Sequence, residues 1–291
     1  MAAFKLAVLT DEISQDIGRA LEVAAREFGL GWVELRAMHN KNIMRWDARE
    51  VGEVRRLLRR YGLRVSQIAS PLFKVDWPGA PRSRFSPIGD QFGADFTYEQ
   101  QDEVLERAID LARAFETRYV RCFDFWRLDD QAPYRRDIDE RLRQAAERAG
   151  RGGVTLALEN ESSCNTATGA EAARLLDAVR HPALMLNWDP GNAANAGETP
   201  YPDGYARLPK RRIVHVHVKD VARRRDGSGF EWTRMGDGLI DYVGQFRALL
   251  RDGYRGPVSL ETHWRGAGTA EESTRQSMAR LKALLAKAGA L

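Results

Sequence analysis

The chain has 291 residues, enough for one large domain or two smaller ones, and 43% of them are hydrophobic, so a sizeable core can form. Basic residues exceed acidic ones by only four charges, which disfavours nucleic acid as a partner. No apolar run is long enough to cross a membrane and the N-terminus lacks a signal-peptide pattern, so we expect a cytoplasmic protein without a membrane partner.

Eight runs of β-forming residues recur along the chain, and amphipathic helical stretches lie between them. The predicted strands are Lys5–Thr10, Trp32–Arg36, Arg64–Ser70, Tyr119–Phe125, Val154–Glu159, Ala183–Asp189, Ile213–Lys219 and Pro257–Thr262. The predicted helices are Asp16–Phe28, Asp47–Tyr61, Tyr98–Phe115, Tyr134–Ala149, Thr168–Val179, Tyr242–Leu250 and Thr269–Ala288. Parallel strands need such crossover connections, so eight rounds predict an α/β fold, a single (β/α)8 TIM barrel in one domain over residues 1–291. An open doubly wound sheet is less favoured because no glycine-rich dinucleotide motif follows the first strand.

The longest connection follows the third predicted strand and contains the segment Pro71–Ala94, which is rich in proline, glycine and aromatic residues and has no clear periodicity. In a barrel this connection lies at the C-terminal ends of the strands, where active sites are built. We weigh two interpretations equally. The segment is either a lid or substrate-contacting element, or a surface excursion that takes part in contacts between copies of the chain.

Four consecutive predicted strands finish on a residue type that binds metals. These residues are Glu159, Asp189, His217 and Glu261. A single carboxylate at a strand end is often a helix cap, but four such residues in succession would converge at one mouth of a barrel and therefore predict a metal site. Three carboxylates and one imidazole suit one divalent cation, with Mn²⁺ as the first expectation and Mg²⁺, Co²⁺ and Zn²⁺ as alternatives.

The pleat of the seventh predicted strand, Ile213–Lys219, decides between two histidines. His215, His217 and Lys219 share one face, whereas the alternating valines suit packing against the outer helices. His217 lies nearer the C-terminal rim, so we assign it as the metal ligand. We expect His215 one layer deeper, as a hydrogen-bonded interior residue that can support a ligand.

Five motifs in the C-terminal half form a set. They are LEN (Leu158–Asn160), NWDPGN (Asn187–Asn192), HVHVKD (His215–Asp220), GDGLIDY (Gly236–Tyr242) and GYRGPVSLE (Gly253–Glu261). The set resembles the xylose-isomerase-like TIM-barrel superfamily, specifically its sugar phosphate isomerase/epimerase members. The N-terminal half agrees mainly through its strand–helix rhythm and through Glu34 in WVELR.

The resemblance implies one divalent cation bound by Glu159, Asp189, His217 and Glu261, with the two glutamates also moving protons. In the ketose 3-epimerases of the superfamily it also implies that Arg223, six residues after His217, contacts substrate.

The chain departs from the ketose 3-epimerase pattern at two positions. Asn192 stands where those epimerases usually have a histidine three residues after the aspartate ligand, and Glu161 follows LEN where many relatives have a histidine. These departures concern the identity of the substrate more than the metal. Lys219 in HVKD resembles a lysine that is found in other branches of the superfamily. Its ammonium either polarises a substrate oxygen or simply pairs with Asp220 or another carboxylate.

The expected function is that of a divalent-metal-dependent sugar isomerase or epimerase, which removes a proton next to a carbonyl and passes through an enediolate. Glu159 and Glu261 are the expected catalytic base and acid. The candidates for binding a small sugar or keto-sugar substrate are Glu34, Arg36, Asn160, Asn192, Lys219, Arg223 and His263. A homo-oligomer is left open.

Three alternatives are weighed against this function. The same groups would run a lyase, as in inosose dehydration or β-elimination from a 3-keto-glycoside, if the carbon beyond the enolate carries a leaving group. The endonuclease IV branch, which cleaves abasic DNA with three zinc ions, is disfavoured because the chain has only five histidines. A sugar- or metal-binding barrel without turnover is disfavoured because Glu159 and Glu261 are both present.

Overall fold

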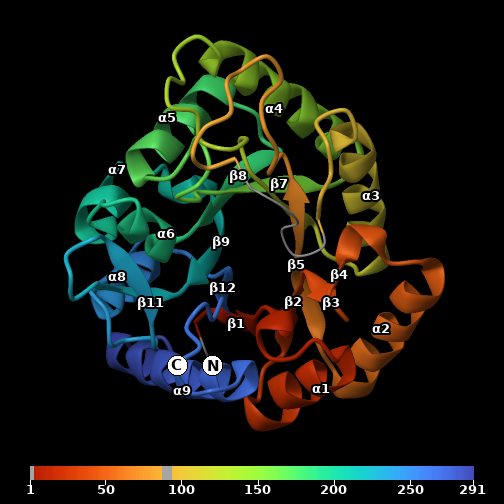
Figure 1. Cartoon of the computed structure of the whole chain (residues 1–291). Helices are drawn as coiled ribbons and strands as arrows, with labels where there is room; N and C mark the ends of the chain where they lie inside the picture. Colours follow the sequence, from red (N-terminus) through yellow and green to blue (C-terminus); the bar gives the residue numbers. More distant parts are fainter. Residues whose placement is uncertain (1–2, 87–93) are drawn as a thin grey trace.

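The computed structural model describes residues 3–86 and 94–291 (Figure 1). Eight strands form one parallel sheet in the order β1-β12-β9-β8-β7-β6-β5-β2. They are β1 (Lys5–Val8), β2 (Trp32–Leu35), β5 (Arg64–Leu72), β6 (Tyr119–Cys122), β7 (Thr155–Glu159), β8 (Leu184–Trp188), β9 (Ile213–Val218) and β12 (Pro257–Leu260). A parallel bridge between Leu9 and Glu34 joins the two outer strands, so the sheet nearly closes into a barrel.

Helices cover the outside of this sheet, and the predicted TIM barrel is confirmed (Figure 1). They are α1 (Ile17–Glu22), α2 (Ala48–Tyr61), α3 (Gln101–Ala114), α4 (Arg135–Arg151), α5 (Gly169–Val179), α8 (Tyr242–Arg251) and α9 (Ala270–Ala288). Capping boxes start α2 and α5: Asp47 and Thr168 accept a backbone N–H, and Glu50 and Glu171 accept one in return. Within the described ranges, no helix combines the length and the apolar character needed to cross a bilayer.

Several short elements at the C-terminal ends of the strands were not predicted. The connection from β8 to β9 contains α6 (Pro190–Asn195) and α7 (Tyr205–Arg207). One hairpin, β3 (Ala37–Met38) and β4 (Lys41–Asn42), follows β2, and another, β10 (Asp220–Arg223) and β11 (Phe230–Thr233), follows β9. These insertions lie on the face where a barrel carries its functional loops.

The predicted Pro71–Ala94 segment begins inside β5, because this strand continues to Leu72. Residues 87–93 of the segment lie outside the described residues. Its described part supplies Pro71, Lys74 and Ala94 to the wall of a cavity at the mouth of the barrel. A contact with substrate or with another copy of the chain therefore stays a prediction.

The interior of the barrel beneath this mouth is polar rather than aliphatic. Glu34, Gln67, Asn187 and His215 are all fully buried there. His215 Nδ1 lies 3.1 Å from Asn187 Oδ1. This contact gives His215 a hydrogen-bond partner inside the barrel, as the strand pleat predicted. Because buried polar groups are costly unless they are paired, this layer fixes the orientation of the side chains above it.

Candidate active site

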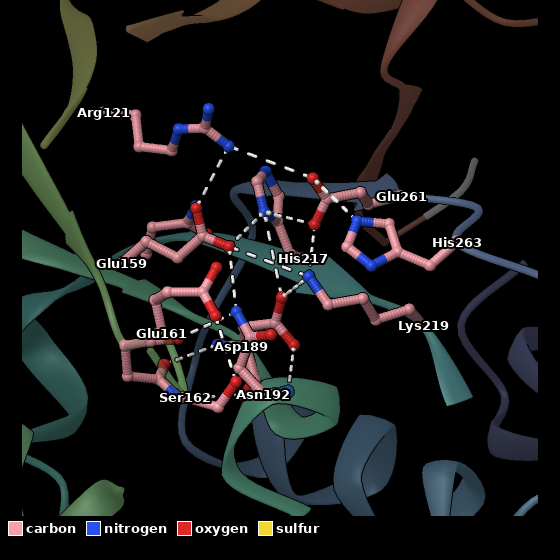
Figure 2. Close-up of polar contacts among 12 residues, drawn as sticks. Arg121, Glu159, Glu161, Ser162, Asp189, Asn192, His217, Lys219, Glu261 and His263 are labelled. Atoms are coloured by element: carbon pink, nitrogen blue, oxygen red, sulfur yellow. Dashed lines mark hydrogen bonds and ion pairs between the residues drawn. The ribbon is translucent and has the colours of Figure 1, made fainter. Parts of the chain in front are cut away.

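Four ligand-type side chains meet at the C-terminal mouth of the barrel (Figure 2). Glu159 is the last residue of β7, Asp189 directly follows β8, His217 lies near the end of β9 and Glu261 directly follows β12. One ligand atom of each lies within 4.8 Å of the others, and all four residues are at most 3% exposed. The structure thus brings together the four residues that the strand ends predicted as a set.

His217 is held by a carboxylate on the side away from this cluster. Its Nε2 lies 2.9 Å from Glu34 Oε2, and Gln67 Nε2 donates to Glu34 Oε1 at 2.8 Å. Its Nδ1 faces the cluster, 3.1 Å from Glu159 Oε1. A carboxylate that fixes the second nitrogen of an imidazole is the usual support of a histidine metal ligand.

The charges around His217 also fit a cation. Burial opposes protonation of His217, but Glu34 and Glu159 outweigh it and raise its pKa well above the ordinary value. Burial likewise opposes ionisation of Glu34, yet His217 and His215 hold the pKa of Glu34 at about 2. Because Nδ1 faces carboxylates, it needs a proton or a cation beside it. The three carboxylates and this nitrogen can therefore hold a divalent ion.

The two carboxylate oxygens of Asp189 have different partners, one in helix α6 and one in the ligand cluster. Oδ1 accepts the backbone N–H of Asn192 at 2.9 Å and so caps α6, while Oδ2 lies 2.5 Å from Lys219 Nζ. Gly191 lets α6 pack this closely, because a Cβ there would lie 2.6 Å from Lys219 Cγ. Burial and Glu159 raise the pKa of Asp189 to about 6, against the lowering effect of Lys219.

The two glutamates also divide their oxygens. Glu159 turns Oε1 toward His217 and Oε2 toward Arg121, whose Nη1 lies 3.1 Å away. Glu261 turns Oε2 toward Lys219 and Oε1 toward Arg36 Nη1, at 2.9 Å. Each glutamate therefore presents one oxygen to the cluster and the other to an arginine on the cavity wall.

Both glutamates favour the ionised form. Burial opposes ionisation of Glu159, but His217 and Arg121 outweigh it and lower the pKa of this carboxyl. For Glu261 burial is outweighed by Lys219 and His263, so its pKa is lowered as well. Two buried carboxylates on one cavity, each able to accept a proton, are suited to proton transfer at a bound molecule.

Three other predicted residues lie against this site. Arg36 lines the cavity and binds Asp11 and Glu12 as well as Glu261. Lys219 pairs with Asp189 and Glu261. It does not pair with Asp220, whose side chain accepts the backbone N–H groups of Gly236 and Gly238.

His263 also lines the cavity. Its Nε2 lies 3.5 Å from Glu261 Oε1, and its ring meets Trp232 edge to face at 4.8 Å.

Four predicted substrate-binding residues have other placements. Glu34 is buried beneath His217, so it is suited to holding this ligand rather than to touching substrate. Asn160 binds the backbone N–H and C=O of Asp189, and Asn192 donates to Glu159 Oε1 at 3.2 Å. Both asparagines therefore position ligands. Arg223 is exposed at the end of β10 and stacks over Phe230, away from the cluster.

The space above the cluster has a volume of about 490 Å³, part of which is open to solvent. Sequence reasoning missed three of its lining residues, Asn42, Arg121 and Glu161, and included Lys74 only as part of the Pro71–Ala94 segment. The sequence does contain a signal for Arg121, because this arginine stands between the apolar residues Val120 and Cys122 of a predicted strand. Lys74 and Glu161 form an ion pair of 3.1 Å between two loops, and no local sequence pattern predicts such a contact.

These features define a barrel with a ligand-rich mouth, and comparison with known proteins gives its class. The chain belongs to the xylose isomerase-like TIM barrel family, whose model matches residues 23–284.

Its curated relatives include enzymes that modify sugars. A 3-oxo-isoapionate decarboxylase of Pectobacterium atrosepticum is 29% identical over 167 residues, 55% of this chain and 57% of that protein. The L-ribulose-5-phosphate 3-epimerase UlaE of Escherichia coli K12 is 28% identical over 208 residues, 70% of this chain and 69% of that protein. The chain thus spans little more than half the length of the decarboxylase that it matches.

A crystal structure of the IOLI protein with a bound zinc atom superposes with a TM-score of 0.75. It is 14% identical, and the superposition covers 98% of this chain and 99% of that chain. At this identity the likeness supports the fold.

Proposed function

We propose that this protein is a divalent-metal-dependent sugar isomerase or epimerase of the ketose 3-epimerase type, which removes a proton next to a carbonyl. The proposal rests mainly on one observation: Glu159 and Glu261 share the metal-type cluster, and each keeps an oxygen on the cavity side. The similarity to an L-ribulose-5-phosphate 3-epimerase supports it.

Glu159, Asp189, His217 and Glu261 would hold the cation, which when bound polarises a substrate carbonyl and stabilises the adjacent negative charge. One glutamate removes the proton from the carbon and becomes a carboxylic acid. The other glutamate, which takes up a proton from solvent through the cavity before this step, supplies that proton to the opposite face of the same carbon and becomes a carboxylate. Exchange with solvent through the cavity restores both groups.

Arg36, Arg121 and Lys219 assist in ways that follow from their contacts. The two arginines hold the cavity-side oxygens of the glutamates, so proton transfer takes place along a fixed direction. Lys219 is buried among Asp189 and Glu261 and keeps positive charge beside them. Cations fixed in a dry site stabilise negative charge that develops on a substrate oxygen.

Deuterium incorporation tests the reaction class. The metal-loaded enzyme is incubated in D2O with a panel of ketoses and ketose phosphates, and the products are analysed by mass spectrometry. We expect one deuterium at a carbon next to the carbonyl, without loss of any group, together with the epimer or isomer. An unsaturated product, or release of water or CO2 without exchange into the sugar, would contradict an isomerase or epimerase.

A lyase or decarboxylase of keto acids is the second candidate. It is favoured by the similarity to a 3-oxo-isoapionate decarboxylase and by three basic residues on the cavity wall, Arg36, Lys74 and Arg121. A guanidinium can bind a carboxylate in a defined orientation. When a 3-oxo acid is added to the panel in D2O, release of CO2 with deuterium at the carbon that carried the carboxyl group would support this second function.

Removal of the metal should abolish turnover. After dialysis against a chelator, we expect activity at the detection limit and a lower melting temperature, because a cation bound only by the folded state stabilises it. Titration with Mn²⁺, Mg²⁺, Co²⁺ and Zn²⁺ in separate samples should restore both properties and rank the ions. Full activity after verified removal of all divalent ions would refute metal dependence.

The carboxylate behind His217 should control metal affinity. Glu34→Gln is expected to weaken Mn²⁺ binding about 10- to 100-fold, because the amide cannot hold His217 as a charged acceptor does. Isothermal titration calorimetry of the chelator-treated protein measures this. Glu198→Gln, at a half-buried carboxylate beside Gly169, is the matched control and should bind Mn²⁺ like the parent. Equal affinity in Glu34→Gln would show that Glu34 does not support the ligand.

A further inference from the structure

A second cavity lies beside the proposed catalytic one, at the C-terminal end of β5. Its volume is about 780 Å³, including solvent at its mouth. Lys74 and Ala94 line both cavities. Lys74 Nζ pairs with Glu161 Oε2 at 3.1 Å, and Glu161 faces the catalytic cavity. The two cavities are therefore adjacent, so one molecule that extends past the Lys74–Glu161 pair can reach both.

The second cavity has aromatic walls. Its described lining includes Trp77, Phe96, Tyr98 and Trp126. Trp77 meets Tyr98 edge to face, with 5.7 Å between ring centroids. Flat rings supply a large contact area for a flat or puckered ring, and ligand sites are typically built in this way.

These walls are held in place by their neighbours. Trp77 packs edge to face against the buried Phe125, with 4.8 Å between ring centroids, and Tyr98 lies 6.0 Å from the same ring. On the other side, Lys74 Nζ lies 5.4 Å from the centre of the Trp126 ring. Rings that are already fixed lose little freedom when a ligand binds, which favours affinity.

The charges of this cavity differ from those of the catalytic one. In its described lining, Asp76 pairs with Arg82 and Asp95 with Arg45, and Lys74 pairs with Glu161, so most of the charged groups are already balanced. Balanced charges of this kind give a phosphate or carboxylate no excess of positive charge to bind, which favours an uncharged ligand. Carboxylates on the rim can instead accept hydrogen bonds from hydroxyl groups.

We propose that the second cavity binds an uncharged glycosyl unit, joined to the sugar that reacts over Glu159 and Glu261. The substrate is then a ketose-containing disaccharide or a larger keto-glycoside, with the C–H face of its second ring on the aromatic wall. This inference rests on the proposed function, because it takes the Glu159–Glu261 cavity as the place of the reacting ring.

Binding of matched sugars tests the proposal. Dissociation constants are measured by isothermal titration calorimetry with the Mn²⁺-loaded protein, for D-fructose and for turanose, maltulose and isomaltulose, which carry a glucosyl unit at different positions of fructose. We expect one of the disaccharides to bind at least about tenfold more tightly than D-fructose, a gain of about 1.4 kcal/mol. If no disaccharide binds more tightly than fructose, the proposal is wrong.

Variants assign this gain to the aromatic wall. Trp77→Ala and Phe96→Ala should each remove most of the disaccharide advantage and leave the affinity for D-fructose unchanged. Trp77→Phe keeps a ring and should retain most of the advantage, which separates loss of the platform from misfolding. Trp32→Ala, at the opposite end of the barrel between Lys5 and Arg64, is the matched control. An equal loss for fructose and disaccharide in Trp77→Ala would overturn the assignment.

Two further measurements separate the remaining outcomes. One outcome is that phenyl β-D-glucopyranoside binds more tightly than methyl β-D-glucopyranoside while no disaccharide binds more tightly than fructose. In that case the cavity binds an aryl group and the glycosyl assignment fails. Deuterium incorporation into fructose, assayed separately, reports on the proposed function. If deuterium exchanges into fructose but no disaccharide binds more tightly than fructose, only the proposal of glycosyl binding in the second cavity is refuted. If a disaccharide binds more tightly in a way that depends on Trp77, but no sugar takes up deuterium, only the proposed chemistry is refuted.

Discussion

Glu159→Gln and Glu261→Gln should each lower kcat about 10²- to 10⁴-fold at saturating Mn²⁺, the usual contribution of a positioned acid or base. Glutamine keeps an oxygen that can bind a cation, but it neither accepts nor donates a proton at the reacting carbon. Both residues are also metal-ligand candidates, so the rate must be measured across a Mn²⁺ titration. The loss of rate that remains at the plateau is the loss due to proton transfer.

Asp189→Asn is the matched control for this experiment. Asp189 belongs to the same cluster, but it does not line the catalytic cavity as the two glutamates do, because one of its oxygens caps α6 and the other faces Lys219. Asparagine also caps helices well. We therefore expect Asp189→Asn to need more Mn²⁺ and then to recover most of its rate, unlike either glutamate variant.

Deuterium exchange gives the two glutamates separate signatures. If they act on opposite faces of one carbon, Glu159→Gln should still exchange the proton of the epimer that Glu261 deprotonates, but should not interconvert the two epimers. Glu261→Gln should exchange only the other epimer. If both variants exchange both epimers at parental rates, neither glutamate is the base. If both lose all exchange at saturating metal, a two-base mechanism is wrong.

The strand ends were predictable because topology alone determines where they lie. Parallel strands in a barrel all end at the same mouth, so Glu159, Asp189, His217 and Glu261 can be grouped without knowing any loop. The alternation of β9 also distinguishes His217 from His215, because nothing interrupts this strand between them. Strand endings and an unbroken pleat are local properties, and the sequence carries both.

The role of Glu34 could not be predicted in the same way. The pairing of β2 with β5 shifts register between Val33 and Glu34, so counting alternate residues from the start of β2 does not give the depth of this side chain. The hairpin after β2 depends on His39 and Asn40, which have φ angles of 50° and 56°. Asparagine tolerates this conformation, but histidine followed by asparagine is a weak turn signal beside Asn-Gly.

Contacts between distant loops could not be predicted from the sequence, for a different reason. Arg36 meets Asp11 and Glu12 because β1 and β2 close the barrel, and Lys74 meets Glu161 because two connections fold over the mouth. Such pairs depend on the stagger of the strands and on loop paths, which the period of a strand or helix does not encode. The site therefore divides into ligands that the strand pattern predicts and ion pairs of the supporting cations that only the folded structure identifies.

Arg121 is the supporting cation with the largest expected effect. Its Nη1 lies 3.1 Å from Glu159 Oε2 and 3.9 Å from Glu261 Oε1, so it stands between the two proposed proton-transfer groups (Figure 2). The backbone carbonyls of Ala69 and Ser70 hold its other nitrogens. Arg121→Met should lower kcat about 10²- to 10³-fold, the range for loss of one fixed donor in an active site.

This substitution should also destabilise the fold, because it leaves a buried carboxylate with fewer partners. We expect a loss of about 3–5 kcal/mol in the free energy of unfolding, measured by urea denaturation of the metal-free protein. Arg121→Lys should regain part of the stability and less of the rate, since an ammonium cannot reproduce the planar fork of a guanidinium. Mn²⁺ affinity should change little in either variant, which separates positioning of the glutamates from loss of metal.

Arg141→Met is the matched control, because this partly buried arginine lies outside the catalytic cavity, over the rings of Phe73 and Tyr98. It should keep the parental kcat. If Arg121→Met has the parental kcat while its Mn²⁺ affinity and fold are intact, the guanidinium does not position the proton-transfer pair. A rise in KM alone would instead place Arg121 among the groups that bind substrate equally in its ground and transition states.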